Sequence, residues 1–195
     1  MKITKEWLNK NNACLEGIEY CEEKGFIGLP AEEFAEKLID VKKLNWANWL
    51  VVRALNKIDR VRYAVYAAKL VLPVYEEKYQ GDDRPRKAID AAESYIDNPC
   101  AAARDAVYAS HAAYAARDAA DAAVAADTAD AAFAADAAYA AAHAADAACI
   151  ADTARVAAHA TAHAAHAAYA TQAGGEETYI KIIKYGINLL NEEEK

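Results

Sequence analysis

Hydrophobic residues in the first half of the chain recur every three or four positions, which is the spacing of an amphipathic helix. The segment NWANWLVVRAL (45–55) shows it clearly, with large apolar side chains at Trp46, Trp49 and Leu50. No stretch shows the strict alternation of apolar and polar residues that is typical of a half-buried strand. The pattern therefore predicts an all-α fold.

Capping and turn residues divide this first half into six expected helices. Pro73 is expected to kink or end the fifth of them near Leu72, because proline lacks the backbone N–H and clashes with the preceding turn. The first expected helix follows a Thr4 cap and contains Trp7 and Leu8, and the second covers about 12–24 and ends at Gly25. The other four cover about 30–39, 45–55, 59–72 with an Asp59 cap, and 84–96.

Residues 100–173 form an alanine-rich tract without a single Gly or Pro. Alanine has the highest helix propensity, so the tract is expected to be helical. Acidic and aromatic residues recur within it every third position, and such a stripe winds around a helix by about 60° per step. One straight rod would be about 110 Å long and could not keep these carboxylates on one face. We therefore expect breaks at Asp127-Thr128 and Asp152-Thr153, and close packing of three helices through alanine.

The length of 195 residues fits one domain, with an N-terminal helical part (1–98), the alanine-rich helices (99–173) and a C-terminal helix (174–195). That last helix should place Tyr179, Ile182, Ile183 and Leu190 toward the core. The sequence shows neither a signal peptide nor an apolar run long enough to cross a bilayer, so we expect a cytoplasmic protein. The four cysteines lack metal-site spacing and are expected to be buried thiols.

The net charge of −8 is distributed unevenly. Residues 42–87 carry eleven Lys and Arg against five acids, which gives this basic segment a charge of +6 within an acidic chain. An acidic protein with one basic segment is a poor binder of long nucleic acid, but such a segment suits a small anion.

Arginine and aromatic residues are interleaved in the basic segment. Trp and Tyr offer stacking surfaces for a base, and Arg offers forked donors for phosphate. The alternative is that the aromatic residues belong to the core and the arginines pair with Asp59, Asp82 and Asp83. Residue types alone favour this alternative. The candidate ligand-binding residues in this segment are Trp46, Trp49, Arg53, Arg60, Arg62, Tyr63, Tyr66, Arg84 and Arg86.

A second candidate group lies in the alanine-rich tract, where the spacing of His159, His163 and His166 places all three on one helical face. The favoured interpretation is that they hydrogen-bond to Asp residues of a neighbouring helix. An anion- or partner-binding face comes second, and a metal site third, because no Cys or Glu completes a compact ligand set. His143 and Asp146, three residues apart, are a weaker pair.

Three segments resemble a known family: WLNKNNACLEGIEY (7–20), NWANWLVVRAL (45–55) and DDRPRKAIDAAESYIDNP (82–99), followed by the alanine-rich tract. Together they are similar to the Imm5-like immunity proteins of bacteria and phages, over nearly the whole chain. The resemblance implies an all-helical, non-enzymatic protein that neutralises a toxin or a component of cellular defence. It carries over no catalytic residue.

Two functional hypotheses follow, and neither needs a cofactor or a resident metal. In the first, the protein sequesters a small nucleotide-derived immune signal in a bacterial or phage-infected cell, using the basic segment with help from the histidine face. In the second, it is an immunity protein that covers a protein toxin. A metal-binding or purely structural helical protein is a weaker alternative. No Ser-His-Asp, phosphate-loop or HExxH motif indicates an enzyme, no membrane partner is expected, and self-association stays open.

Overall fold

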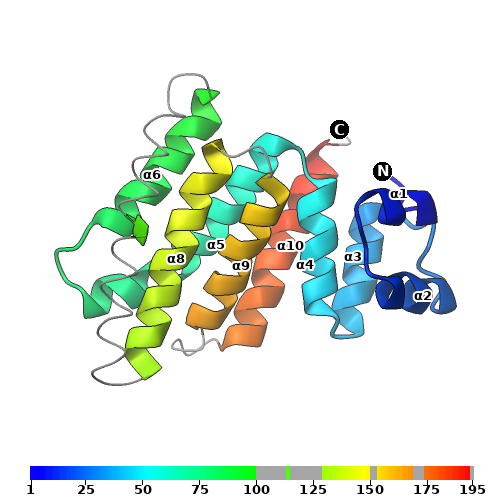
Figure 1. Cartoon of the computed structure of the whole chain (residues 1–195), viewed down its shortest axis with the longest axis horizontal. Coiled ribbons are helices and arrows are strands. Elements are labelled where there is room, and N and C mark those ends of the chain that lie inside the picture. Colours follow the sequence, from blue (N-terminus) through cyan, green and yellow to red (C-terminus); the bar gives the residue numbers. More distant parts are fainter. Residues whose placement is uncertain (100–112, 115–128, 150–152, 169–173, 194–195) are drawn as a thin grey trace. The chain divides into compact units, whose positions relative to one another are not determined.

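The computed structural model describes residues 1–99, 113–114, 129–149, 153–168 and 174–193 (Figure 1). Within these residues the chain is helical, with an isolated bridge between Lys2 and Pro30 and no named strand, which confirms the all-α prediction. The helices are α1 (Lys5–Lys10), α2 (Leu15–Glu23), α3 (Ala31–Asp40), α4 (Leu44–Ala54), α5 (Lys57–Lys78), α6 (Arg84–Asp97), α8 (Ala129–Cys149), α9 (Thr153–Ala167) and α10 (Gly175–Glu193).

The chain forms two compact units, and each is described by itself. The first comprises Met1–Leu55 and Ile183–Lys195, and the second comprises Asn56–Ile182. These boundaries differ from the three parts that composition suggests, because the helix that follows the alanine-rich tract is shared between the units. None of the described helices combines the length and apolarity that crossing a membrane requires.

In the first unit, helices α3 and α4 pack against each other. The Thr4 side chain accepts a hydrogen bond from the backbone N–H of Trp7 and caps α1, as the sequence predicts. Gly25 has a φ of 70°, the left-handed conformation that ends a helix, and it follows α2. The core of this unit includes the side chains of Phe34, Leu38 and Leu50.

Helix α5 differs from its prediction in its N-cap residue and in the position of its C-terminal end. Asn56, and not Asp59, is the N-cap, because its side-chain oxygen accepts from the Asp59 N–H at 2.9 Å. The sequence predicts that Pro73 kinks or ends the helix; Pro73 lies inside the helix, which continues to Lys78, so the end near Leu72 is wrong. Leu72 and Tyr75 are buried on either side of Pro73, and this packing offsets the missing hydrogen bond.

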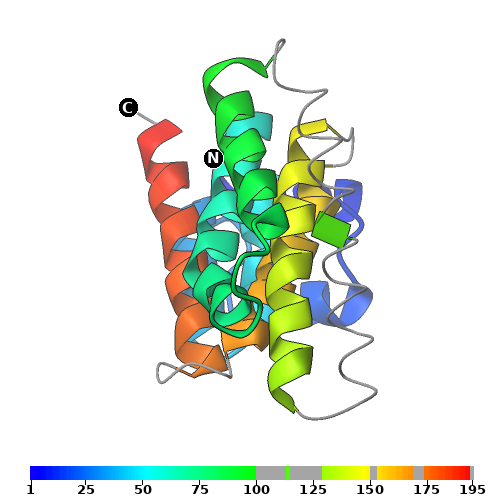
Figure 2. The same cartoon turned by 90° about the vertical axis from the view of Figure 1, so that its left-hand side faces the viewer.

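The second unit is built from α5, α6, α8 and α9, with α8 in contact with each of the other three (Figures 1 and 2). Helices α8 and α9 are antiparallel, since Asp136 meets His166, Tyr139 meets His163 and His143 meets His159. The described part of the alanine-rich tract is therefore two packed helices, as expected. Its first third and the breaks themselves lie mostly outside the described residues.

Alanine forms most of the buried surface of α8. Its fully buried positions include Ala137, Ala138, Ala140, Ala141, Ala142, Ala144, Ala145 and Ala147. Side chains this small let neighbouring helices approach closely, so α8 is held by many close contacts between small groups.

The C-terminal helix and the cysteines match their predictions in part. Ile182, Ile183 and Leu190 of α10 are buried as expected, whereas Tyr179 is half-buried. Cys21 is a buried thiol, and burial raises its pKa to about 11. Cys14, the N-cap residue of α2, is exposed, so its predicted burial is wrong. The side chains of Cys100 and Cys149 lie outside the described residues.

Candidate functional site

Five of the eleven cations of the basic segment form ion pairs with carboxylates. Arg62 binds Asp59 at 2.8 Å, and Arg86 binds Glu76 with two nitrogens at 2.6 and 2.7 Å. Further ion pairs join Arg84 to Asp82, Lys69 to Glu93 and Lys87 to Asp83. Three of the five predicted arginines, Arg62, Arg84 and Arg86, therefore pair with nearby acids, as in the alternative interpretation. These pairs reduce the charge available to a free anion.

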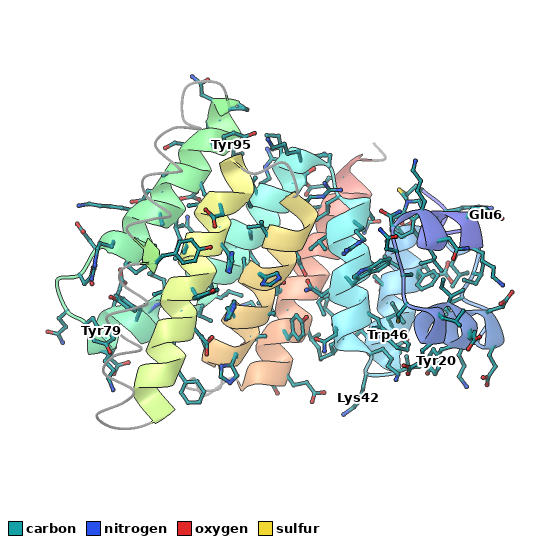
Figure 3. All side chains as sticks on the ribbon, viewed as in Figure 1. Glu6, Tyr20, Lys42, Trp46, Tyr79 and Tyr95 are labelled. Carbon is teal, nitrogen blue, oxygen red and sulfur yellow. The ribbon has the colours of Figure 1, made fainter. Side chains whose placement is uncertain are left out.

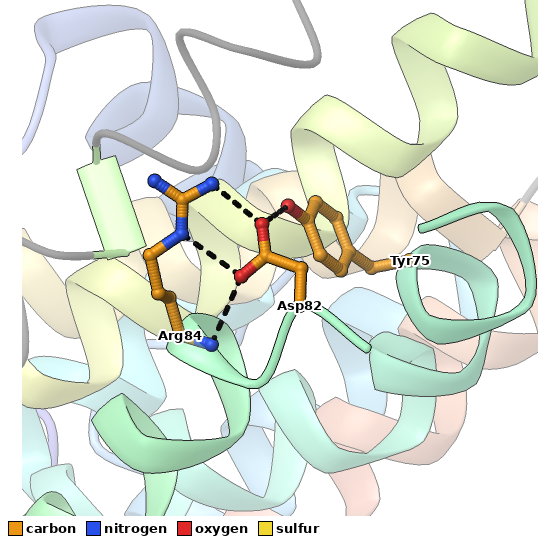
Figure 4. A network of polar contacts seen from close by, with 3 residues as sticks. All are labelled: Tyr75, Asp82 and Arg84. Carbon is orange, nitrogen blue, oxygen red and sulfur yellow. Dashed lines mark hydrogen bonds and ion pairs between the residues drawn. The ribbon is translucent and has the colours of Figure 1, made fainter. Parts of the chain in front are cut away.

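The Arg84 pair belongs to a three-residue network that joins α5 to the start of α6 (Figure 4). Asp82 accepts from the Tyr75 hydroxyl at 2.7 Å, and from Nε and Nη2 of Arg84 at 2.8 and 2.5 Å. The hydrogen bond from Arg84, which outweighs the effect of burial, holds the pKa of Asp82 far below its usual range. Arg84 therefore shapes the turn between two helices.

Replacing Asp82 with Asn is expected to lower the free energy of unfolding at pH 7 by about 1–2 kcal/mol, since hydrogen bonds to a charged group are lost. A carboxyl whose folded pKa is depressed stabilises the protein above its unfolded pKa, near 3.9, and loses this contribution as the pH falls toward the folded pKa. Urea unfolding at pH 7 and pH 3 should therefore show a smaller gap between wild type and variant at the lower pH.

The matched control is Asp83→Asn, because the Asp83–Lys87 pair is exposed on both sides. Its expected effect is below about 1 kcal/mol at either pH. An Asp82→Asn variant as stable as wild type at pH 7 would contradict a structural role for the network.

Two tryptophans and one arginine of the predicted site lie in the first unit. The Arg53 guanidinium lies 4.3 Å above the Trp49 ring, and Trp49 meets Trp7 edge to face. Trp46 packs against Tyr20, with ring centroids 5.5 Å apart (Figure 3), and the Lys43 ammonium lies over its ring. Both tryptophans are thus engaged within the unit.

Trp46 and Trp49 line an apolar cavity of about 50 Å³, together with Leu8, Phe34, Leu50 and other apolar residues. For comparison, a cavity of about 150 Å³ binds benzene. The cavity is therefore too small for a nucleobase, and its wall offers almost no polar group to bind one.

The remaining residues predicted from the basic segment lie on α5. Tyr63 is completely buried, and desolvation raises the pKa of its hydroxyl well above the usual value. Its predicted role at a ligand surface is wrong, because it belongs to the core. Arg60 and Tyr66 are half-buried, and burial also raises the pKa of Tyr66.

The histidine face of α9 packs against a polar face of α8. His163 and His166 each direct Nδ1 at one oxygen of Asp136 on α8, and the His163 distance is 2.7 Å. Burial opposes ionisation of Asp136, but the hydrogen bonds from both histidines outweigh it and lower the pKa of the carboxyl. Hydrogen bonding to an Asp of a neighbouring alanine-packed helix is the favoured sequence interpretation, and it is confirmed for these two histidines.

His143 of α8 completes a group that the sequence did not reveal. Its ring lies 5.3 Å from that of His159 and 5.7 Å from that of His163, measured between centroids. One ring nitrogen from each of the three histidines lies within 4.8 Å of the other two. We call these three residues the imidazole cluster. Tyr139 borders it, with its ring 4.2 Å from His163 and 4.7 Å from His143.

Burial increases across the cluster from α9 to α8. His159 is exposed, His163 is half-buried, and His143 is only 8% exposed. The Nδ1 atom of His143 lies 3.1 Å from the Tyr114 hydroxyl, which in turn donates to Asp146 at 2.5 Å. The cluster is therefore open to solvent at His159, whereas hydrogen bonds hold His143 and His163.

A regular spacing marks the α8 face of this site in the sequence, although it does not show which helix that face meets. Asp136, Tyr139, His143 and Asp146 are separated by three, four and three residues, so they share one face of α8. The α9 histidines are separated by four and three residues in the same way. The imidazole cluster lies where the two matching faces meet.

The predicted site residues are divided between the two units, and the arrangement that gathers chemistry-bearing side chains is the imidazole cluster. Comparison with known proteins found no matching family, no similar characterised protein and no similar solved structure. A proposal for the function therefore rests on the geometry of the cluster, on charge, and on the resemblance of the sequence segments.

Proposed function

We propose that the chain is a non-enzymatic binding protein that sequesters a small nucleotide-derived ligand, and that the imidazole cluster with Tyr139 is its binding site. The observation that supports this most is the meeting of four rings from two helices in the second unit. The rings of Tyr139, His159 and His163 are partly accessible, and that of His143 is buried. Aromatic and imidazole rings in such an arrangement offer stacking surfaces for a base.

Hydrogen bonding adds to this stacking surface. Imidazole nitrogens can donate to phosphate oxygens, and the exposed His159 is the most accessible of them. Asp136 and Asp146 already accept hydrogen bonds from His163 and Tyr114, which offset part of their negative charge near the cluster. The site thus combines stacking surfaces with nearby polar groups, as a small nucleotide requires.

The basic segment supports the proposal less well than its charge suggests. Arg62, Arg84 and Arg86 would each have to leave a carboxylate before binding a phosphate. We therefore assign the primary contacts to the α8 and α9 rings.

Calorimetric titration with a panel of cyclic dinucleotides, cyclic mononucleotides and ADP-ribose derivatives tests the proposal. At least one compound is expected to bind saturably and to be recovered unchanged after heat denaturation. Tyr139→Leu should weaken that binding by about 5- to 150-fold, because loss of base stacking costs about 1–3 kcal/mol.

Arg86→Ala is the matched control, since it removes only a cation that is paired with Glu76 on the surface. It should leave the affinity unchanged. Absence of binding to every compound, or binding that Tyr139→Leu does not alter, would contradict the proposal. Capture of a protein toxin without any small ligand would favour the immunity-protein alternative instead.

A further inference from the structure

The imidazole cluster also has the composition of a transition-metal site. Its His159 and His163 are four residues apart on α9, the spacing with which two histidines of one helix bind zinc. His143 approaches from the antiparallel helix α8, so the three side chains converge from two elements. All three potential ligands are nitrogen donors, a set that suits Zn²⁺ and similar ions rather than Mg²⁺ or Ca²⁺.

Hydrogen bonds select the ring nitrogen that would bind the metal. Tyr114 uses its only proton to donate to Asp146, so it accepts from Nδ1–H of His143. The ionised Asp136 accepts from Nδ1–H of His163. In a neutral imidazole with its proton on Nδ1, the lone pair is on Nε2, the atom that a metal takes.

We propose that His143, His159 and His163 bind one divalent transition-metal ion of the Zn²⁺ class. Nitrogens around a tetrahedral zinc ion, at about 2.0–2.1 Å from it, are about 3.4 Å apart. The cluster nitrogens lie within 4.8 Å of one another, so small rotations of the side chains bring them to this distance. His159 is exposed and adapts without disturbing the core.

Asp136 and the Tyr114–Asp146 pair act as positioning residues for the two hydrogen-bonded histidines. A carboxylate that holds the distal nitrogen of a ligand histidine fixes its tautomer and raises its basicity. Asp136 does this directly for His163, and Asp146 acts on His143 through the Tyr114 hydroxyl. Both carboxylates also place negative charge close to the cation.

A metal ion at this site would also contact the nucleotide of the proposed function. That part of the inference rests on the proposed function. Three protein ligands leave a fourth coordination position open, and a phosphate oxygen is a suitable ligand for it. A bound cation would supply the positive charge that the paired arginines do not. Metal binding alone can nevertheless be measured without any nucleotide.

Calorimetric titration of ZnCl₂ into tag-free, chelator-treated protein tests the site, with native mass spectrometry to count bound ions. We expect one Zn²⁺ per chain. His159→Ala should weaken binding by about 100-fold or more, since even loss of a positioning residue costs about 10–100-fold. Because His159 is exposed, this variant should keep the melting temperature of wild-type apoprotein.

His166→Ala is the matched control, because His166 lies on the same helix and shares Asp136 but is outside the cluster. It should retain one Zn²⁺ per chain and an affinity within about tenfold of wild type. Asp136→Asn should weaken binding by about 10–100-fold. Absence of Zn²⁺ binding, or binding that His159→Ala leaves unchanged, would overturn the metal site.

Repeating the nucleotide titrations with and without Zn²⁺ separates the two proposals. Zn²⁺ binding with no nucleotide binding in either condition would leave the metal site standing and contradict the sequestration function. Nucleotide binding by protein that takes up no Zn²⁺ would support the sequestration function and contradict the metal site.

Discussion

Replacing Ala137 and Ala141 together with Leu is expected to lower the free energy of unfolding by about 2–6 kcal/mol, because each overpacked position costs about 1–3 kcal/mol. Both alanines are completely buried and lie one turn apart on α8. The larger side chains would force α8 away from its neighbours or into strained rotamers. Urea unfolding followed by circular dichroism measures the effect.

An exposed alanine in α9 provides the matched control. Ala162→Leu adds the same atoms at a solvent-facing position, so its effect should be within about 0.5 kcal/mol. A double variant at Ala137 and Ala141 as stable as wild type would mean that α8 does not pack closely through its alanines.

Phe34→Ala is expected to lower the free energy of unfolding by about 3–5 kcal/mol, the range for removing a buried aromatic side chain. Phe34 is only 1% exposed, its ring meets that of Phe26 edge to face, and it borders the existing cavity. The variant would enlarge that cavity and remove the ring contact. Chemical unfolding measures the loss.

Leu15→Ala serves as the comparison, because Leu15 is 69% exposed on α2. This change should alter stability by less than about 0.5 kcal/mol. Equal effects of the two substitutions would contradict the assignment of Phe34 to the core.

Much of the helical architecture could be predicted from local signals. Thr4 and Gly25 act over one helical turn, so their effect is readable from the sequence. The division of the alanine-rich tract into packed helices also follows from the reasoning that one rod could not keep its acidic stripe in water. These features depend on residues close together along the chain.

Helix α5 shows where local signals fail. Pro73 is a helix breaker by its own chemistry, yet buried side chains on either side keep the helix intact. Tyr63 looks equally suited to a ligand surface and to a core, and only the packing of the second unit decides between them. In both cases a tertiary environment overrides the preference of a single residue.

The sequence predicts the α9 residues of the candidate site but not the contribution of α8. The spacing of the α9 histidines predicted a shared face and an Asp partner, and Asp136 provides it. The role of His143 could not be predicted, because it depends on the register between α8 and α9, which no local pattern fixes. The charge of the basic segment overstates the positive charge available to a ligand. Several of its cations form ion pairs, with partners up to 24 positions away in the sequence.

Imidazole NMR of ¹⁵N-histidine-labelled protein tests the central claim most directly, because it reports which ring nitrogen carries a proton or a metal. Before metal is added, His143 and His163 should show protonated Nδ1. Zn²⁺ should then shift the Nε2 signals of these two residues and one ring nitrogen of His159, and leave His166 bonded through Nδ1 to Asp136. Spectra that Zn²⁺ does not change at these three histidines would contradict the account.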